Sequence, residues 1–382
     1  MHAPRTGDVT LNDILVPQSA LADDAPEYAL TAAIQDFQYM MEQHHVDLDQ
    51  LSAEVKLSCN IDYYIGQVNN GGHSQYIANS GVDFALFENV EKALSLMGAT
   101  RILKLHQQMH EWCRENPKAA AEQDGFSQRE DTLDTLDDAL YALSDTKHDY
   151  YKKSTAWLKS LPNLYPTSDT GWKRIASLLA RNQPDFTAKQ KLAQITNIGL
   201  QMNDPFMVAL RMIGAQTHPL IEVYHQTAGS MVGHPDGSND VVWALKTNTD
   251  IRAGYHQGGD VVLAKWQDSS FQKIESEIGR MPTGDADALI DGMWDANVPV
   301  ALFVMLRDAG LKSGKAYISV LSPSSLRVTF GKQILSYDIG NTHVLTDATG
   351  KAIATVPLSR AAHLADIAAN SGAIAFEQAL EQ

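Results

Sequence analysis

Cysteine is scarce in this chain, which contains only Cys59 and Cys113 among 382 residues. Two cysteines cannot supply the set of disulfides that stabilises many small secreted proteins, so we expect a cytoplasmic protein. Long apolar runs are also lacking. None approaches the ~18 residues of a membrane span, and residues 1–8 contain no apolar signal core. The sequence therefore predicts neither a membrane segment nor a membrane partner.

Basic residues are few as well, with 30 Lys and Arg against 46 Asp and Glu, which gives a net charge of -16. They form no cluster larger than the dipeptides Lys152-Lys153 and Lys173-Arg174, which disfavours direct binding of nucleic acid. The acidic excess is uneven. Residues 1–170 contain 26 acidic and 12 basic residues, whereas residues 171–382 contain 20 and 18. The amino-terminal half is therefore expected to attract basic partners.

The common catalytic motifs are absent, including Gly-x-Ser-x-Gly, the phosphate-binding Gly-x4-Gly-Lys and His-Glu-x-x-His. We therefore predict no cofactor. His106, His110 and Cys113 share one helical face and are weak candidates for metal ligands, but no fourth ligand can be named, and a packed histidine face explains them too. Residues 229–237 and 255–260 concentrate Gly, His and Asp. They are either active-site loops of an enzyme, such as a metal-dependent hydrolase, or plain hairpin connections.

The spacing of apolar residues along the chain changes once, near Pro219. Before it, apolar residues recur at the three- and four-residue steps of helices; after it, short apolar runs alternate with turns rich in Gly, Asp and Asn. The fold class predicted is α+β, with an all-α amino-terminal domain followed by a mixed α+β carboxy-terminal domain. The predicted parts are an arm over 1–25, an acidic helical domain over 26–166, a helical connector over 167–218, and an α+β domain of unknown type over 219–382.

A polar stretch interrupts the helical half between Val68 and Gly81. Consecutive Asn and Gly residues end a helix readily because both accept the left-handed conformation. We expect a helix over about 48–68 to end here and another to follow over about 84–97, so that the corner sets how the two helices meet. A small binding site is the alternative interpretation. The motif consists of Asn69, Asn70, Gly71, Gly72, Gln75, Tyr76 and Asn79.

A second feature is a stripe of carboxylates in a predicted long helix, about 128–160. Carboxylates at three- and four-residue steps recur every ~4.5–6 Å along a helix, which roughly imitates the ~3.4 Å spacing of phosphates along one DNA strand. A solvated face without a partner is the alternative. The predicted partner-binding residues are Glu130, Asp131, Asp134, Asp137, Asp138, Asp145 and Asp149.

The corner resembles the signature of a bacterial DNA-mimic protein family of the neisserial type, over about residues 25–165. In that family an acidic residue precedes Val-Asn-Asn-Gly-Gly, and aromatic residues follow. This sequence instead has Gln67 before the motif, His73 after it and Ile77 at the last aromatic position. The resemblance implies a compact all-helical domain. It also implies that surface carboxylates imitate DNA and occupy a DNA-binding protein.

Together these features predict a non-enzymatic acidic protein that binds a basic protein. That partner is expected to be a DNA-binding protein or, in an immunity or antitoxin-like role, a basic toxin. Self-association as a homodimer stays open. The competing hypothesis is an enzyme whose site lies within residues 219–382.

Overall fold

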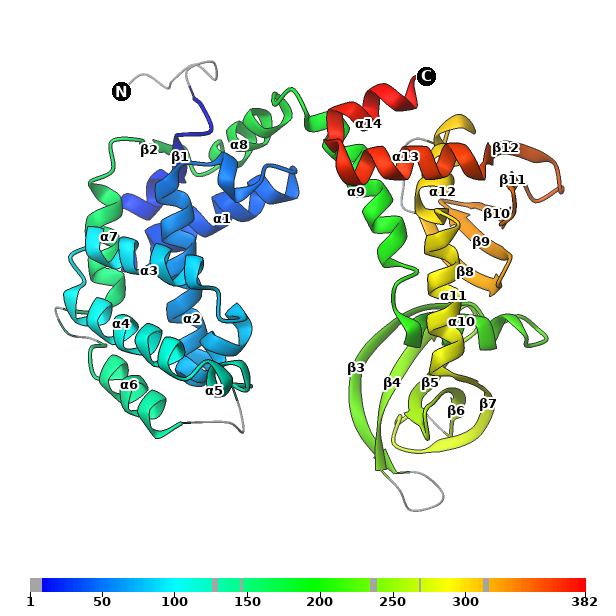
Figure 1. Cartoon of the computed structure of the whole chain (residues 1–382), viewed down its shortest axis with the longest axis horizontal. Helices are drawn as coiled ribbons and strands as arrows, with labels where there is room; N and C mark the ends of the chain where they lie inside the picture. The colour runs from blue at the N-terminus through cyan, green and yellow to red at the C-terminus, as the bar shows by residue number, and fades with distance from the viewer. Residues whose placement is uncertain are drawn as a thin grey trace. The chain divides into compact units, whose positions relative to one another are not determined.

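The computed structural model describes residues 9–125, 130–144, 146, 148–233, 239–267, 269–311 and 316–382. The chain divides into two compact units, Met1–Phe186 (unit 1) and Thr187–Gln382 (unit 2), which Figure 1 draws with their helices and strands labelled. The division falls inside the segment predicted as a helical connector, whose helices are shared between the two units. Helices dominate unit 1 and two sheets lie in unit 2, so the predicted α+β class is confirmed.

Unit 1 is built on a single hydrophobic core that draws side chains from its helices and from a short strand pair. Phe37, Ile61, Tyr64, Tyr76 and Phe87 are among its fully buried large side chains. Its elements, in chain order, are β1 (Ile14–Pro17), a 3-10 turn (Gln18–Leu21), α1 (Ala29–Gln43), a second 3-10 turn (Leu48–Gln50), α2 (Ala53–Ser80), α3 (Phe84–Leu96), α4 (Thr100–Glu115), α5 (Pro117–Ala121), α6 (Asp131–Tyr141), α7 (Tyr150–Lys159), β2 (Leu164–Thr167) and α8 (Trp172–Arg181).

The described part of the amino-terminal arm is integrated into this core. Strand β1 pairs in parallel with β2, with Ile14 opposite Leu164. Ile14, Leu15 and Val16 are fully buried and contribute to the core of unit 1. The arm therefore holds the two ends of unit 1 together.

The long helix predicted over 128–160 is wrong, because the structure has two helices, α6 and α7, in its place. Asp149 begins α7, and its side chain accepts hydrogen bonds from the backbone nitrogens of Tyr151 at 2.9 Å and Lys152 at 3.4 Å. An aspartate that satisfies the first amides of a helix in this way starts a new helix.

Unit 2 contains two antiparallel five-stranded meanders, with strand orders β3-β4-β5-β6-β7 and β12-β11-β10-β9-β8. The strands are β3 (Val223–Gly233), β4 (Asn239–Thr247), β5 (Ile251–Gln257), β6 (Asp260–Trp266), β7 (Ile274–Pro282), β8 (Ala316–Ser322), β9 (Ser325–Phe330), β10 (Gln333–Asp338), β11 (Thr342–Thr346) and β12 (Ala352–Pro357). The helices are α9 (Phe186–Leu200), α10 (Pro205–Ala215), α11 (Thr283–Asp295), α12 (Val298–Asp308), α13 (Leu358–Asn370) and α14 (Gly372–Leu380).

One order of elements occurs twice in unit 2. A buried apolar helix, α10 or α12, precedes a meander, and a further helix, α11 or α13, follows it and packs on the first. Helix α10 contacts β3, β6 and β7 of the first sheet and also β8 of the second, and α12 contacts β11 and β12 of the second. Both buried helices have a proline in their first turn, where the missing N–H costs nothing. In both halves, an apolar helix that precedes the sheet thus packs on that sheet and buries one of its faces.

The first sheet curls on itself around a small core of its own. Val242, Tyr255 and Val262 face this core, while the opposite face of the sheet packs toward α10 through residues such as Leu245 and Leu263. An isolated parallel bridge joins Gly233, at the end of β3, to Lys273, just before β7. The two outer strands therefore meet, and the sheet forms a nearly closed barrel.

The described residues include no single helix that is both long enough and apolar enough to cross a membrane. Helices α11 and α12, bent by 55° at their junction, meet the requirements of length and composition only when they are taken together. Helix α10 is apolar but shorter.

Candidate functional site

Helix α2 is sharply kinked at the Asn-Asn-Gly-Gly motif. Gly71 and Gly72 leave the helical conformation, with φ -152° at Gly71 and φ 78°, ψ -177° at Gly72. The second of these conformations is essentially restricted to glycine. Residues 73–80 then form a second helical arm, so α2 consists of two helices that meet at Gly71 and Gly72, and the first of them ends at the motif as expected. The motif sets the angle between the two arms of α2.

The kink frees backbone groups that α6 binds. The backbone nitrogen of His73 donates to Asp137 Oδ1 at 2.8 Å, and His73 Nδ1 lies 2.5 Å from the same oxygen. The far ring nitrogen of His73 is 2.9 Å from the Tyr64 hydroxyl. On the next turn of α6, the Tyr141 hydroxyl donates to the carbonyl of Val68 at 2.7 Å. These bonds fasten α6 to both arms of α2.

Amide side chains of the motif cross the kink. Gln67 Oε1 accepts from Gln75 Nε2 at 2.8 Å and from Asn79 Nδ2 at 2.6 Å. An oxygen acceptor is therefore present at position 67, where the resembling family has a carboxylate. Asn69 and Asn70 are exposed at the outside of the bend. The motif thus stabilises the bend of α2, because Gln75 and Asn79 of one arm both donate to Gln67 of the other.

The candidate metal ligands lie in an aromatic cluster instead of around a common centre. His106 packs against the rings of Tyr64, Tyr76 and Phe87. Both His106 and His110 turn Nδ1 toward Glu91 Oε1, at 3.5 and 2.7 Å. Cys113 Sγ lies 3.8 Å from Met109 Sδ. No group of three or more His, Cys, Asp or Glu that could hold a metal occurs in the part of the chain that the structure describes.

Burial controls the ionisation of this cluster. It lowers the pKa of His106 to about 4, and it raises the pKa of the Cys113 thiol to about 12. The pKa of Glu91 is lowered to about 2, first by the hydrogen bond with His106, then by the one with His110. A thiol that stays protonated at neutral pH is neither a good nucleophile nor a good metal ligand, so Cys113 suits packing better than either role.

The acidic face is smaller than the sequence suggested. Asp131, Asp134 and Asp138 lie on the exposed side of α6, with Glu130 exposed just before the helix. Positions i, i+3 and i+7 share one side of a helix, which explains their common exposure. Glu122 and Asp124 are also exposed shortly before this segment. We call Glu130, Asp131, Asp134 and Asp138 the α6 acidic face.

Two other predicted members, Asp137 and Asp149, do not belong to this face. Asp137 is only 6% exposed and is bound to His73, so it is not available for the partner contact predicted for it. It lies one residue, or about 100°, around the helix from Asp138, which brings it to the side that faces α2. Asp149 is half-buried as the cap of α7, and Asp145 lies outside the described residues.

The glycine- and histidine-rich segments of unit 2 are parts of hairpins where the structure describes them. Gly258 and Gly259, with φ 61° and 91°, form the two-residue turn between β5 and β6. The His256 ring packs at 4.9 Å from the ring of Phe206. Residues 229–233 belong to β3, and residues 234–237, including His234, lie outside the described residues. The hairpin interpretation therefore explains the described part of both segments.

Fold and site together define unit 1 as a mainly helical domain, with the one strand pair β1–β2 in its described part, in which a glycine-kinked helix holds an acidic helix against the core. Residues 49–161 match the family model described as DMP19-like protein, which confirms the resemblance over α2 to α7. No curated protein matches the chain, and no solved structure does. The matched segment excludes α1, α8 and the β1–β2 pair, which share the same core, and it excludes all of unit 2.

Proposed function

We propose that unit 1 is a docking domain for a basic protein surface and that the α6 acidic face is its contact. The observation that carries this proposal is the two-sided character of α6. One side is fastened to α2 through Asp137 and Tyr141, while the other presents carboxylates to solvent. A rigidly held row of carboxylates loses little conformational entropy on binding.

Charge and family support the same conclusion. Unit 1 contains 27 Asp and Glu against 15 Lys and Arg, so its field favours approach of a cationic surface. The DMP19-like match agrees with a DNA mimic, in which protein carboxylates take the place of phosphates. A DNA-binding protein is therefore the partner we favour, and a basic toxin is a second member of the same class. A cytoplasmic location belongs to this proposal.

The test is affinity capture from a cell lysate by the full chain, followed by mass spectrometry at low and at high salt. The variant Asp131→Asn/Asp134→Asn/Asp138→Asn removes three charges from the α6 acidic face and is expected to lose the partner. Wild-type capture should weaken steeply as salt rises, because exposed charges act over roughly 8 Å at physiological ionic strength.

A matched control removes three charges elsewhere on unit 1. The variant Asp23→Asn/Asp24→Asn/Asp36→Asn changes the net charge equally at exposed positions outside α6. It should retain the partner. If both variants lose capture to the same extent, the overall charge is responsible and the α6 acidic face is not the contact. If neither does, the docking proposal fails.

A further inference from the structure

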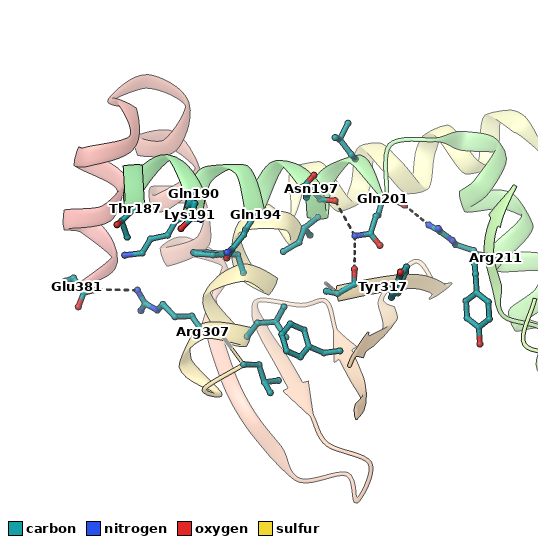
Figure 2. A pocket seen from close by; sticks show the side chains of 18 residues that line it. Thr187, Gln190, Lys191, Gln194, Asn197, Gln201, Arg211, Arg307, Tyr317 and Glu381 are labelled. Atoms are coloured by element: carbon teal, nitrogen blue, oxygen red, sulfur yellow. Dashed lines mark hydrogen bonds and ion pairs between the residues drawn. The ribbon is translucent and has the colours of Figure 1, made fainter. Parts of the chain in front are cut away.

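Unit 2 contains an open groove of about 820 Å³ that lies along α9 (Figure 2). Polar side chains of α9 line one wall. The opposite wall consists of the end of α12 and the first strands of the second sheet, including Phe303, Leu306 and Phe330. This volume lies within the range of known ligand sites, which combine an apolar floor with a few polar groups. The groove is independent of the α6 acidic face in unit 1.

Amide side chains recur along the α9 wall. Gln190, Gln194 and Asn197 are exposed, and their side chains make no hydrogen bond to another described residue. Figure 2 shows them along the helix between Thr187 and Gln201. Steps of three and four residues place amides every ~4.5–6 Å along a helix, close to the ~6.6 Å two-residue repeat of an extended chain. Each amide offers both a donor and an acceptor, as a peptide backbone requires.

Arg211 lies at the Gln201 end of the groove. It is 8% exposed, and its guanidinium donates to the backbone carbonyls of Gln201 at 2.6 Å and Val223 at 3.3 Å. Within the described ranges, no carboxylate forms an ion pair with it; the charge of Asp204, whose side chain caps α10, favours the charged form of Arg211 without an ion pair. A buried cation without a paired carboxylate is costly, and a guanidinium has five N–H donors, so others remain for a ligand. Burial lowers the pKa of Arg211 to about 10, which leaves it charged at neutral pH.

At the opposite end of the groove, the basic side chains form ion pairs with carboxylates. Arg307 Nη1 lies 3.9 Å from a carboxylate oxygen of Glu381, and its Nη2 lies 3.0 Å from Asp308. Lys191 is likewise paired with Glu377 at 2.7 Å. The cations at this end are thus neutralised by carboxylates, whereas Arg211 is not. The groove therefore has one end that favours an anion.

Addition of a strand to the neighbouring sheet is blocked at this point. Strand β8 is an outer strand, and the Gln201 side chain already occupies its free edge. Gln201 Nε2 donates to the Ala316 carbonyl at 2.8 Å, and its Oε1 accepts from Ile318 N at 3.2 Å. A ligand in the groove must therefore bind through the α9 amides and the apolar floor.

We propose that this groove binds an extended peptide segment, with a carboxylate of the peptide on Arg211 and its backbone along Gln190, Gln194 and Asn197. The planar fork of an arginine matches a carboxylate through two parallel hydrogen bonds. The α9 wall is about 21 Å long, which fits roughly six or seven extended residues. This carboxylate is the carboxy-terminus of the peptide.

The experiment uses the immobilised full chain and two pools of random synthetic peptides of about eight residues, long enough to span the groove. One pool ends in a free carboxylate and the other in a carboxamide. Bound peptides are identified by mass spectrometry and their affinities are measured by titration. We expect capture from the carboxylate pool at least about tenfold above the carboxamide pool, because charge-assisted bonds are roughly twice as strong as neutral ones.

Variants locate the binding within the groove. Gln194→Ala/Asn197→Ala changes two exposed side chains, so the protein stays folded, and binding should weaken about fivefold to tenfold. Arg211→Lys keeps the charge but removes the fork, and it should reduce the preference for the carboxylate pool. The control Thr196→Ala/Gln333→Ala removes two exposed polar groups outside the groove and should bind as the wild type does.

Three outcomes would overturn the proposal. The first is no capture above a blank resin. The second is capture that Gln194→Ala/Asn197→Ala leaves unchanged. The third is that inorganic phosphate alone raises the melting temperature and no peptide is retained, which would show a simple anion site at Arg211. Thermal melting of each variant confirms that the chain is folded.

Discussion

His73 and Asp137, 64 residues apart in the chain, form a buried pair in which one carboxylate oxygen contacts both the ring and the backbone nitrogen of the histidine. With Tyr64 on the far side of the ring, the three residues have the order of a catalytic relay. All three are nevertheless enclosed, with side-chain exposures of 0% for His73 and 8% for Asp137. The arrangement therefore stabilises the kink of α2, and no substrate reaches it.

Gly72 is expected to be intolerant of any side chain. Its φ of 78° is unfavourable for other residues, and a Cβ at this position would overlap the carboxylate of Asp137. Gly72→Ala should therefore lower the free energy of unfolding by more than about 2 kcal/mol, measured by urea denaturation. Gly66→Ala is the control, because Gly66 lies in the same helix with open space around it and should gain up to about 1 kcal/mol. Equal effects of the two substitutions would contradict this explanation.

Adjacent aspartates of α6 should behave in opposite ways. Asp137→Asn removes the buried charge that faces His73 and should destabilise the chain by roughly 3 kcal/mol. Asp138→Asn affects an exposed side chain and should change stability by less than about 0.5 kcal/mol. Chemical denaturation of the two single variants distinguishes the fastening side of α6 from its solvent side. A stable Asp137→Asn protein would refute the structural role given to this pair.

Stability should fall as the pH is lowered from about 6.5 toward 4. The unfolded chain binds a proton on His106 near pH 6.5, whereas burial lowers the folded pKa to about 4. The unfolded state therefore binds more protons within this window, and roughly 3 kcal/mol is lost across it. Glu91, with its pKa lowered to about 2, acts in the same direction at still lower pH.

The variant His106→Phe tests this origin of the pH dependence. The ring already packs among Tyr64, Tyr76 and Phe87, and its one polar contact is the long one of 3.5 Å from Nδ1 to Glu91 Oε1. Phenylalanine should therefore be tolerated, and unfolding curves between pH 7 and 4.5 should become flatter. A slope as steep as that of the wild type would assign the effect to other groups.

The two units should fold independently. The main core of unit 1 and the cores of unit 2 draw on separate residues, divided between Phe186 and Thr187. A fragment of residues 1–186 should show a cooperative thermal transition and strong helical circular dichroism. A fragment that ended at residue 161, the end of the family match, should unfold at a lower temperature because it lacks β2 and α8. Identical melting of the two fragments would contradict the role assigned to the β1–β2 pair.

Most helices and strands were predictable because their signals are local. The three- and four-residue apolar steps of α1 to α4 and the alternating runs of unit 2 express the geometry of each element by itself. The division between α6 and α7 was hidden because apolar periodicity continues across it and only Asp149 indicates a new start. The fate of Asp137 could not be predicted from its neighbours, because its partner His73 lies on another helix.

The repeated order of elements in unit 2 left a faint trace in the sequence. Residues of α11–α12 and α13–α14 correspond at a constant offset of 75 positions, and a left-handed residue separates the helices in both pairs, with φ 52° at Asn297 and 81° at Gly372. The strands of the two meanders differ in length and in their turns, so no continuous sequence alignment shows the repeat. The corresponding residues are Pro282 and Pro357, Ala286 and Ala361, and Leu289 and Leu364.

The pairing of β1 with β2 has a consequence for the order of events at the ribosome. Ile14, Leu15 and Val16 are synthesised 150 positions before their strand partners Leu164, Tyr165 and Pro166. Helix α1, which also contacts β1, follows soon after it, but the strand edge that β2 covers stays open until nearly all of unit 1 has been synthesised. The helices of α2 to α7 can assemble earlier, since their contacts are closer in sequence. The last step in closing unit 1 during translation is therefore the pairing of β2 with β1.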